Sequence, residues 1–170
     1  MLIRRLRESD DRSEFDCGSK ALNDRVRKYA AQNQEKHASV TFVALDEDGV
    51  RVVGFVTVCA GSLRAASLPK HEARGLSRHP QPTMVLARVG VDKQHRGQGI
   101  ASSLLVRAYE QSLLQAEATG CIGIEVESKS GAESFYENQG FVRLTLADGG
   151  ERTRLFLPIS AVQDALEDGD

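Results

Sequence analysis

A strand-like run that leads through a glycine-spaced loop into a helix is the feature that most constrains the fold. Residues 83–91, TMVLARVGV, are mostly apolar and β-branched, which is typical of a strand. Residues 92–99 bring charged side chains and two glycines, and from Ile100 onward apolar residues recur at helical spacing. A strand that leads at once into a helix indicates a chain of alternating strands and helices, and therefore an α/β fold.

The first part of the chain predicts a strand, a helix and a hairpin. Residues 2–7 read as a short strand, and Ser19 is a suitable N-cap for a helix over residues 20–34. Two β-branched runs flank the turn sequence DEDG at residues 46–49, which predicts a hairpin. Within this helix, Leu22, Val26, Tyr29 and Asn33 recur at helical spacing.

The second part begins after residues 64–82, an irregular basic segment that reads as a long loop. We expect a helix from Ile100 to about Ala118, a strand over residues 121–128 and a short helix over residues 131–139 that ends at Gly140. Two closing strands, residues 141–146 and 152–159, are joined around Asp148-Gly149-Gly150. The chain is therefore predicted to be a single α/β domain over residues 1–170, with a mixed central sheet of six to seven strands flanked by about four helices. The inner face of the long helix is expected to carry Leu104, Leu105, Ala108, Leu113 and Ala116.

Composition limits the environment and the cofactors. No apolar run approaches the roughly 20 residues that span a bilayer, and the start of the chain lacks the apolar centre of a secretory signal, so a cytoplasmic protein without membrane contact is expected. Cys17, Cys59 and Cys121 are far apart and do not stand at zinc-ligand spacing. They read as buried thiols, and no metal site is expected.

Charge is unevenly distributed along the chain. Residues 1–110 hold 18 Lys and Arg against 13 Asp and Glu, whereas residues 111–170 hold 4 against 11 and end in an acidic tail from about Asp164. A basic front half favours a polyanionic partner, although scattered solubilising charges explain any single residue about as well. The basic residues concerned are Arg4, Arg5, Arg7, Arg25, Arg27, Lys28, Arg64, Lys70, Arg74 and Arg78, with His71 and His79.

The glycine-spaced loop is a candidate anion site. Gly97 and Gly99 allow the backbone to turn tightly and to approach a ligand without a Cβ atom. If the helix opens at Gly99, amides from about Arg96 to Ala101 point to one spot at its N-terminus, where the helix dipole also favours an anion. Arg96 and Lys93 could add positive charge. The alternative is a plain strand-to-helix turn, because a pair of glycines alone is weak support for a ligand site.

The sequence QHRGQGIA at residues 94–101 resembles the Q/R-x-x-G-x-G/A signature of GNAT N-acetyltransferases, and GAESFYENQGF at residues 131–141 resembles a later motif of that family. The resemblance implies a GNAT fold with a cofactor core at about residues 83–142, and acetyl-coenzyme A (acetyl-CoA) as cosubstrate. The residues that it implies for cofactor binding are Val89, Gly90, Val91, Gln94, Arg96, Gly97, Gln98, Gly99, Ile100 and Ala101.

The same resemblance implies direct transfer of the acetyl group to an amine. Tyr136 matches the family tyrosine that protonates the departing thiolate, although a tyrosine there could also simply pack the short helix onto the sheet. A backbone N–H near Val89 or Gly90 is implied to face the thioester oxygen. Glu125 and Glu127 share one face of their strand and are candidate bases or merely solvated side chains, so the general base stays unassigned.

Residues 15–45, from FDCG to TFVAL, resemble the start of the GNAT toxins of bacterial toxin–antitoxin pairs. This implies that the N-terminal part and the loop over residues 63–82 face the acceptor, the α-amino group of an aminoacyl-tRNA, so that translation is inhibited. It also implies a ribbon-helix-helix antitoxin and a homodimer as partners. Two alternatives remain: a housekeeping acetyltransferase for a small-molecule or protein amine, and a CoA-binding module without turnover.

Overall fold

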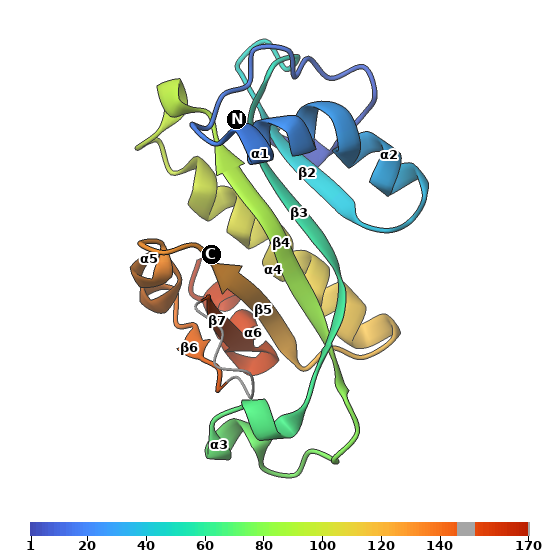
Figure 1. Cartoon of the computed structure of the whole chain (residues 1–170), viewed down its shortest axis with the longest axis vertical. Helices are drawn as coiled ribbons and strands as arrows, with labels where there is room; N and C mark the ends of the chain where they lie inside the picture. The colour runs from blue at the N-terminus through green and yellow to red at the C-terminus, as the bar shows by residue number, and fades with distance from the viewer. Residues whose placement is uncertain (146–151, 170) are drawn as a thin grey trace. The chain divides into compact units, whose positions relative to one another are not determined.

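The computed structural model describes residues 1–145 and 152–169 (Figure 1). Its strands form a mixed seven-stranded sheet of order β1-β2-β3-β4-β5-β7-β6, which confirms the predicted α/β fold and strand number. The strands are β1 Leu2–Arg5, β2 Val40–Leu45, β3 Val52–Leu63, β4 Gln81–Val91, β5 Gly123–Ser128, β6 Val142–Arg143 and β7 Thr153–Pro158. The α-helices are α1 Lys20–Asp24, α2 Ala30–Glu35, α3 Lys70–Ala73, α4 Ile100–Ala118, α5 Glu133–Asn138 and α6 Ile159–Glu167.

The chain divides into two compact units. Unit 1 comprises Met1–Cys59 and Ala87–Ala108. Unit 2 comprises residues 60–86 and the described residues from Tyr109 onward. Strands β3 and β4 and helix α4 each contribute residues to both units.

Unit 1 is built on the predicted hairpin. Strand β2 pairs antiparallel with β1 and with β3, and the turn between β2 and β3 is closed by the Asp46 carboxylate, which accepts hydrogen bonds from the backbone N–H groups of Val50 and Arg51. Phe15 and Phe55 meet edge to face at 5.5 Å between ring centroids in the core beneath this hairpin. The segment that contains Phe15 is thereby anchored to the sheet.

The predicted first helix forms, with a local change of register. Ser19 caps α1 by accepting a hydrogen bond from the Leu22 N–H, but residues Arg25–Tyr29 form a π-helical turn before α2 begins. A π-turn places one extra residue in the helical repeat. Val26 and Ala30 are consequently buried, whereas Tyr29, which follows Val26 at helical spacing in the sequence, is 48% exposed.

Helix α4 is packed closely on the sheet of unit 1. A Cβ atom at Gly54 of β3 would lie 2.7 Å from the Ile100 side chain and 3.1 Å from that of Leu104. Likewise, a Cβ atom at Gly90 of β4 would lie 2.7 Å from the Phe55 ring. These two glycines allow the first turn of α4 and the end of β4 to approach β3, so the loop between β4 and α4 is held at both ends.

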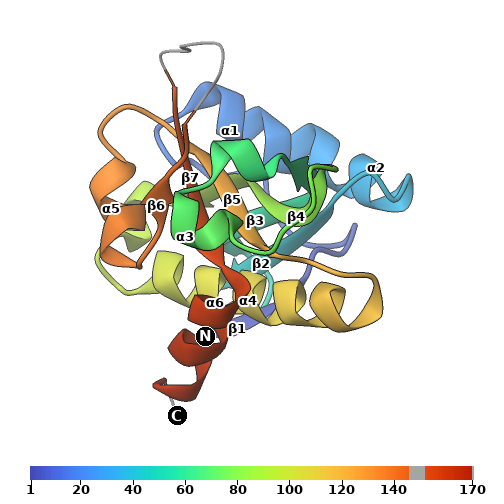
Figure 2. The ribbon, with the colours of Figure 1, turned by 90° about the horizontal axis from the view of Figure 1, so that it is seen from below.

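Unit 2 holds the parallel pair of the sheet. Strand β4 pairs with β5 in parallel at residues Met84, Val85 and Leu86, and β7 pairs antiparallel with β5 and β6. Helix α5, β6 and β7 lie side by side, as Figures 1 and 2 both show. A Cβ atom at Gly123 would lie 2.3 Å from the Leu157 carbonyl oxygen, so glycine is required where β5 begins beside β7.

Two helices were not predicted from the sequence. Residues 70–73 form α3 within the segment predicted as an irregular loop, and α6 occupies much of the predicted acidic tail. Ile159, Val162 and Leu166 recur on one side of α6, and Val162 is fully buried, so apolar packing orders this end of the chain. The predicted strand over residues 141–146 is shorter, and the expected turn at Asp148-Gly149-Gly150 lies outside the described residues.

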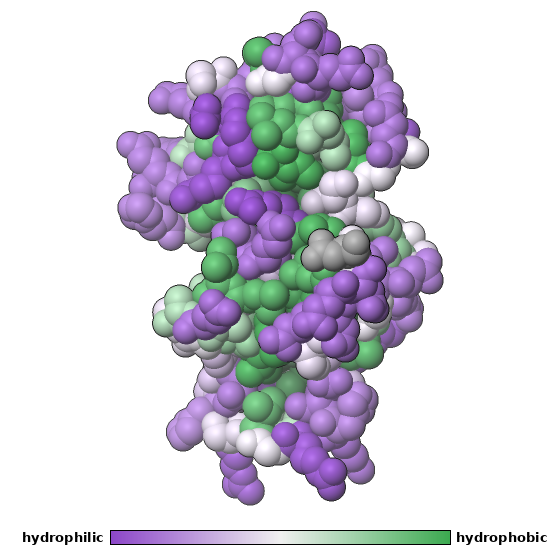
Figure 3. All heavy atoms as spheres, turned by 180° about the vertical axis from the view of Figure 1, so that it is seen from behind, coloured by the Kyte–Doolittle hydropathy of each residue, from purple (hydrophilic) through white to green (hydrophobic). Residues whose placement is uncertain are grey.

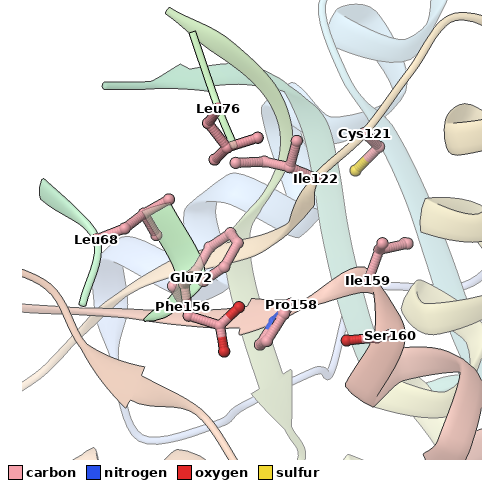
Figure 4. Close-up of a pocket in the computed structure, with 9 residues that line it drawn as sticks. All are labelled: Leu68, Glu72, Leu76, Cys121, Ile122, Phe156, Pro158, Ile159 and Ser160. Carbon is pink, nitrogen blue, oxygen red and sulfur yellow. The ribbon is translucent and has the colours of Figure 1, made fainter. Parts of the chain in front are cut away.

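A small cavity lies in unit 2. It has a volume of about 270 Å³ and is mostly apolar, with the Glu72 carboxylate and the Ser160 hydroxyl as polar groups (Figure 4).

On the face shown in Figure 3, hydrophilic residues cover most of the surface, and hydrophobic residues gather in smaller patches between them. None of the helices in the described residues is long and apolar enough to cross a membrane.

Candidate functional site

The loop between β4 and α4 in unit 1 has the geometry of an anion cradle. Gly97 and Gly99 have φ angles of +75° and +76°, a region that L-amino acids with side chains rarely adopt. Apart from its own chain neighbours, no described residue places an atom within 4 Å of the position that a Cβ atom would take at either glycine. The backbone on this side of the loop is therefore open to a ligand.

Helix α4 follows this open backbone directly. It is 19 residues long, and its first N–H groups have no partner within the helix because hydrogen bonding starts with the Ser103 N–H on the Gly99 carbonyl oxygen. The exposed N-terminus of such a helix carries partial positive charge and oriented donors. The loop and the helix start can thus bind a phosphate group through backbone amides.

Asp92 fixes the beginning of this loop. Its carboxylate is buried and accepts hydrogen bonds from the backbone N–H groups of Asp16 and Gln94, and it lies 3.4 Å from the His95 ring nitrogen Nδ1. Burial opposes ionisation of Asp92, but these hydrogen bonds outweigh it and lower the pKa of the carboxyl group. Asp92 is consequently an ionised structural anchor, which sequence reasoning did not single out.

The other residues of unit 1 that were predicted to bind the cofactor lie on the same segment, from the end of β4 to the first turn of α4. The side chains of Gln94, Arg96 and Gln98 are exposed, while Ile100 is buried against the sheet. Gly90 is buried beneath the Phe55 ring, which gives this glycine a packing function in addition to the predicted one. Val89, Val91 and Ala101 are half-buried.

Tyr136, the predicted acid, belongs to unit 2. It is 8% exposed on helix α5, and its ring meets those of Phe135 and Phe141 edge to face at 5.2 and 5.5 Å between centroids. Burial raises the pKa of the Tyr136 phenol above its ordinary value of 10.0. The hydroxyl group therefore keeps its proton at neutral pH, as a proton donor requires.

A second buried tyrosine, Tyr109 on α4, was not expected from the sequence. It is 3% exposed, and its hydroxyl group has no hydrogen-bond partner among the described residues. Burial, with a smaller contribution from the Tyr136 phenol, raises the pKa of Tyr109 to about 12. A buried hydroxyl without a partner costs free energy in the folded state.

We therefore expect Tyr109→Phe to raise the free energy of unfolding by about 1 kcal/mol, because the substitution removes an unsatisfied hydroxyl and keeps the ring. Urea denaturation followed by circular dichroism measures this change. Tyr29→Phe is the matched control, since Tyr29 is exposed and should leave stability unchanged. A lower stability of Tyr109→Phe would show that the hydroxyl has a stabilising partner.

The two glutamates of β5 are both paired with arginines, one in β7 and one just before it. Glu125 is buried, accepts a hydrogen bond from the Thr83 hydroxyl at 2.8 Å and forms an ion pair with Arg154 at 2.6 Å. Glu127 is paired with Arg152 at 2.6 Å. Both carboxylates are thus engaged in ion pairs with arginines, and the general base stays unassigned.

The structure narrows the set of basic residues that can meet a polyanion. In unit 1, Arg4 is paired with Asp10 and Lys28 with Asp24, and Arg27 donates hydrogen bonds to the carbonyl oxygens of Arg12 and Phe15. Arg5, Arg7 and Arg25 of unit 1 remain exposed. In unit 2 the arginine and lysine side chains of residues 64–78 are exposed and form no ion pair with a described carboxylate. These are Arg64, Lys70, Arg74 and Arg78. His71, by contrast, lies 3.1 Å from the Glu72 carboxylate.

The described residues contain neither a cluster of metal-binding side chains nor a disulfide. They contain no group of three or more His, Cys, Asp or Glu side chains that could hold a metal ion. No disulfide joins the cysteines: Cys17 and Cys121 are buried, and Cys59 is half-buried.

Sequence comparison matches residues 37–143 to the Acetyltransferase (GNAT) domain. The chain is 34% identical over 139 residues to a tRNA-acetylating toxin of Mycobacterium tuberculosis (strain ATCC 25618 / H37Rv), a match that covers 81% of this chain and 82% of that protein. It is 24% identical over 165 residues to the probable toxin TacT of Sinorhizobium fredii (strain NBRC 101917 / NGR234), covering 92% and 89% of the two chains.

Structure comparison finds the same fold over nearly the whole chain. A tyrosine-to-phenylalanine variant of KacT superposes with a TM-score of 0.88 at 24% identity, covering 96% of this chain and 98% of that one. AtaT complexed with acetyl-methionyl-tRNAfMet superposes with a TM-score of 0.87 at 25% identity and the same coverage. AtaTR bound with acetyl-CoA has a TM-score of 0.80 at 24% identity, covering 96% of each chain.

Proposed function

The chain belongs to the GNAT acetyltransferase family, and from this premise we propose that it transfers the acetyl group of acetyl-CoA to the α-amino group of an aminoacyl-tRNA. The observation that carries the proposal is the open loop at Gly97 and Gly99 at the N-terminus of α4, in a chain 34% identical to a tRNA-acetylating toxin. Acetylation of the charged tRNA would remove it from protein synthesis.

We assign the pyrophosphate of acetyl-CoA to the loop of unit 1. The positive φ angles of Gly97 and Gly99 and the empty space beside them fit a phosphate that approaches the backbone closely. The first N–H groups of α4 supply further donors to the same anion. Acetyl-CoA itself supplies the acetyl thioester, and the backbone N–H of Val89 or Gly90 is assigned to the thioester oxygen, where negative charge develops during attack.

Tyr136 is assigned as the general acid. Because burial keeps its phenol protonated, Tyr136 can give its proton to the coenzyme sulfur as the carbon–sulfur bond breaks. The attacking α-amino group forms the new carbon–nitrogen bond and loses a proton to water, since Glu125 and Glu127 are both engaged by arginines. The products are an acetylated aminoacyl-tRNA and free CoA.

An assay with labelled substrate tests the proposal directly. The protein is incubated with [¹⁴C]acetyl-CoA and pools of tRNA charged with single amino acids, and label is measured in acid-precipitable tRNA before and after mild alkaline cleavage of the ester. We expect label that depends on charging and is released as an N-acetylamino acid. Label on a small amine or on protein instead would favour the housekeeping alternative, and CoA binding without any transfer would favour a non-catalytic module.

The exposed basic residues of unit 2 are proposed to contact the tRNA phosphates. Arg74→Gln combined with Arg78→Gln is expected to raise KM for charged tRNA about tenfold and to reduce the slope of log KM against log salt by about 2, because each lost phosphate contact changes that slope by roughly one. KM for acetyl-CoA should not change.

The control for this experiment is Arg51→Gln, which removes an exposed arginine already paired with Glu14. It should leave both Michaelis constants unchanged. If Arg74→Gln/Arg78→Gln also behaves as wild type at every salt concentration, residues 64–78 do not contact the tRNA.

The proposed partners and location follow from the same relatives. Solved structures related in fold include AtaT with the C-terminus of the antitoxin AtaR, and a KacTA–DNA complex. We propose that a cognate antitoxin of the ribbon-helix-helix class neutralises this chain, that the enzyme forms a homodimer, and that it acts in the cytoplasm, where charged tRNA and acetyl-CoA are found. Coexpression of any short reading frame found beside the gene, with rescue of growth as the readout, tests the first point.

A further inference from the structure

A short N-terminal segment of unit 1, Asp16, Cys17 and Gly18, lies directly against the loop between β4 and α4. The Lys93 N–H donates to the Asp16 carbonyl oxygen at 2.9 Å, and the Asp16 N–H donates to the Asp92 carboxylate at 3.0 Å. One backbone–backbone hydrogen bond and one bond from a backbone N–H to a side-chain carboxylate therefore join segments that are more than 70 residues apart in sequence. We call Asp16, Cys17 and Gly18 the clamp.

The Asp16 carboxylate links the clamp to Lys93. Its Oδ2 atom lies 2.6 Å from the Lys93 ammonium nitrogen, and its Oδ1 atom accepts hydrogen bonds from the Asn23 amide and the Gly18 N–H, both at 2.9 Å. Lys93, Asn23 and Gly18, in that order, hold the pKa of Asp16 far below its usual range. The carboxylate is thus ionised at neutral pH.

Arg96 is held by the clamp as well. Its Nη2 atom donates to the Cys17 carbonyl oxygen at 2.7 Å, and a Cβ atom at Gly18 would lie 3.3 Å from the same nitrogen. Gly18 has a φ angle of +82°, which only glycine adopts readily, and this conformation brings the Cys17 carbonyl to the guanidinium. Both cations that the sequence offers for a phosphate therefore have partners in the clamp.

We propose that Asp16 is a positioning residue for acetyl-CoA: the clamp holds Lys93 and Arg96 and so sets the open conformation of Gly97 and Gly99, whose backbone N–H groups bind the pyrophosphate. Asp16 does not touch the coenzyme. This inference rests on the proposed function only in that the loop between β4 and α4 binds CoA.

Direct contact between Lys93 and a phosphate would predict the opposite effect of Asp16 on the affinity for CoA. If Lys93 contacted phosphate directly, Asp16 would compete with the ligand for the ammonium group. An anion beside a polyanion site also weakens binding through simple repulsion. On both grounds Asp16→Asn, which keeps the shape of the side chain and removes its charge, would strengthen CoA binding. A positioning role requires that the same substitution weaken it.

The test is isothermal titration of wild type, Asp16→Asn, Lys93→Met and the double variant with CoA, without any acceptor. We expect Kd for CoA to rise about tenfold in each single variant, the change that the loss of one charge-assisted hydrogen bond produces, and to rise no further in the double variant, because both substitutions break one pair. KM for acetyl-CoA should rise in parallel while kcat stays within about twofold of wild type.

Asp46→Asn is the matched control, because Asp46 also accepts two backbone hydrogen bonds in unit 1 but closes the β2–β3 turn. It should bind CoA as wild type does. Gly18→Ala provides a second route to the same result, since it keeps every charge and displaces Arg96, and it should also weaken CoA binding.

Equal or tighter CoA binding by Asp16→Asn, with weaker binding by Lys93→Met, would overturn the proposal and make Lys93 a direct phosphate ligand. Thermal melting of each variant separates loss of fold from loss of binding, because a clamp that only stabilises the fold would lower the melting temperature and leave Kd unchanged. If the wild-type protein failed to bind CoA, the proposed function would fail instead.

Discussion

Tyr136→Phe is expected to lower kcat for acetyl transfer about 100-fold, because general acid catalysis typically contributes 10² to 10⁴ in rate. KM for acetyl-CoA should change little, since the substitution removes one hydroxyl and keeps the ring packed between Phe135 and Phe141. The wild-type rate should not fall through loss of the Tyr136 proton at any pH at which the aminoacyl ester survives, because burial raises the pKa of the Tyr136 phenol above its ordinary value of 10.0. Steady-state kinetics with purified charged tRNA measures all three quantities.

Tyr29→Phe is the control for Tyr136→Phe, because Tyr29 is exposed on the π-helical turn of unit 1. Induced expression gives a second readout: growth arrest should require Tyr136 and should be unaffected by Tyr29→Phe. A Tyr136→Phe enzyme with wild-type kcat would assign the proton to another donor and leave Tyr136 as a packing residue.

Gly99→Ala is expected to weaken CoA binding about 100-fold. The backbone at Gly99, with φ +76°, disfavours an L-residue by about 1–2 kcal/mol. If the loop moves to relieve this strain, at least one backbone hydrogen bond to phosphate is lost, at about 1.5–3 kcal/mol for a charged acceptor. The relieved strain is not added to this loss, and a lost hydrogen bond of about 2.7 kcal/mol by itself corresponds to a factor of about 100 in Kd. Isothermal titration with CoA measures it.

Gly49→Ala separates strain from ligand binding. Gly49 has a φ angle of +71°, and like Gly99 it has no atom within 4 Å of the position of an added Cβ atom, but it lies in the turn between β2 and β3. Both variants should lose similar stability in urea denaturation. Only Gly99→Ala should lose CoA affinity, and equal affinities in the two variants would mean that the loop does not bind the pyrophosphate.

Elements that rest on short-range patterns could be predicted from the sequence. The hairpin follows from two β-branched runs around a turn sequence, and the end of α4 at Ala118 follows from helical spacing. Gly140 ends α5 with a φ angle of +93°, as expected for a glycine in that position. In each case the residues that determine the structure are close together in sequence.

Other features depend on contacts that the sequence does not display. The π-turn over Arg25–Tyr29 moves burial from Tyr29 to Ala30, and no residue type marks such a turn. Pairing of Lys93 with Asp16 requires the fold to bring distant segments together, so Lys93 read as a phosphate ligand. Helix α6 had a visible signal in Ile159, Val162 and Leu166, but its acidic neighbours made it read as a tail.

The clamp also has a consequence for synthesis of the protein. A ribosome makes Asp16, Cys17 and Gly18 early, but their partners Lys93 and Arg96 follow nearly 80 residues later. Contacts between such distant segments form late, because a long chain must close before they contribute any stability. A nascent chain that stops short of Arg96 would therefore lack the proposed coenzyme site. The active enzyme would form only when most of the polypeptide has left the ribosome, whose own substrates it is proposed to acetylate.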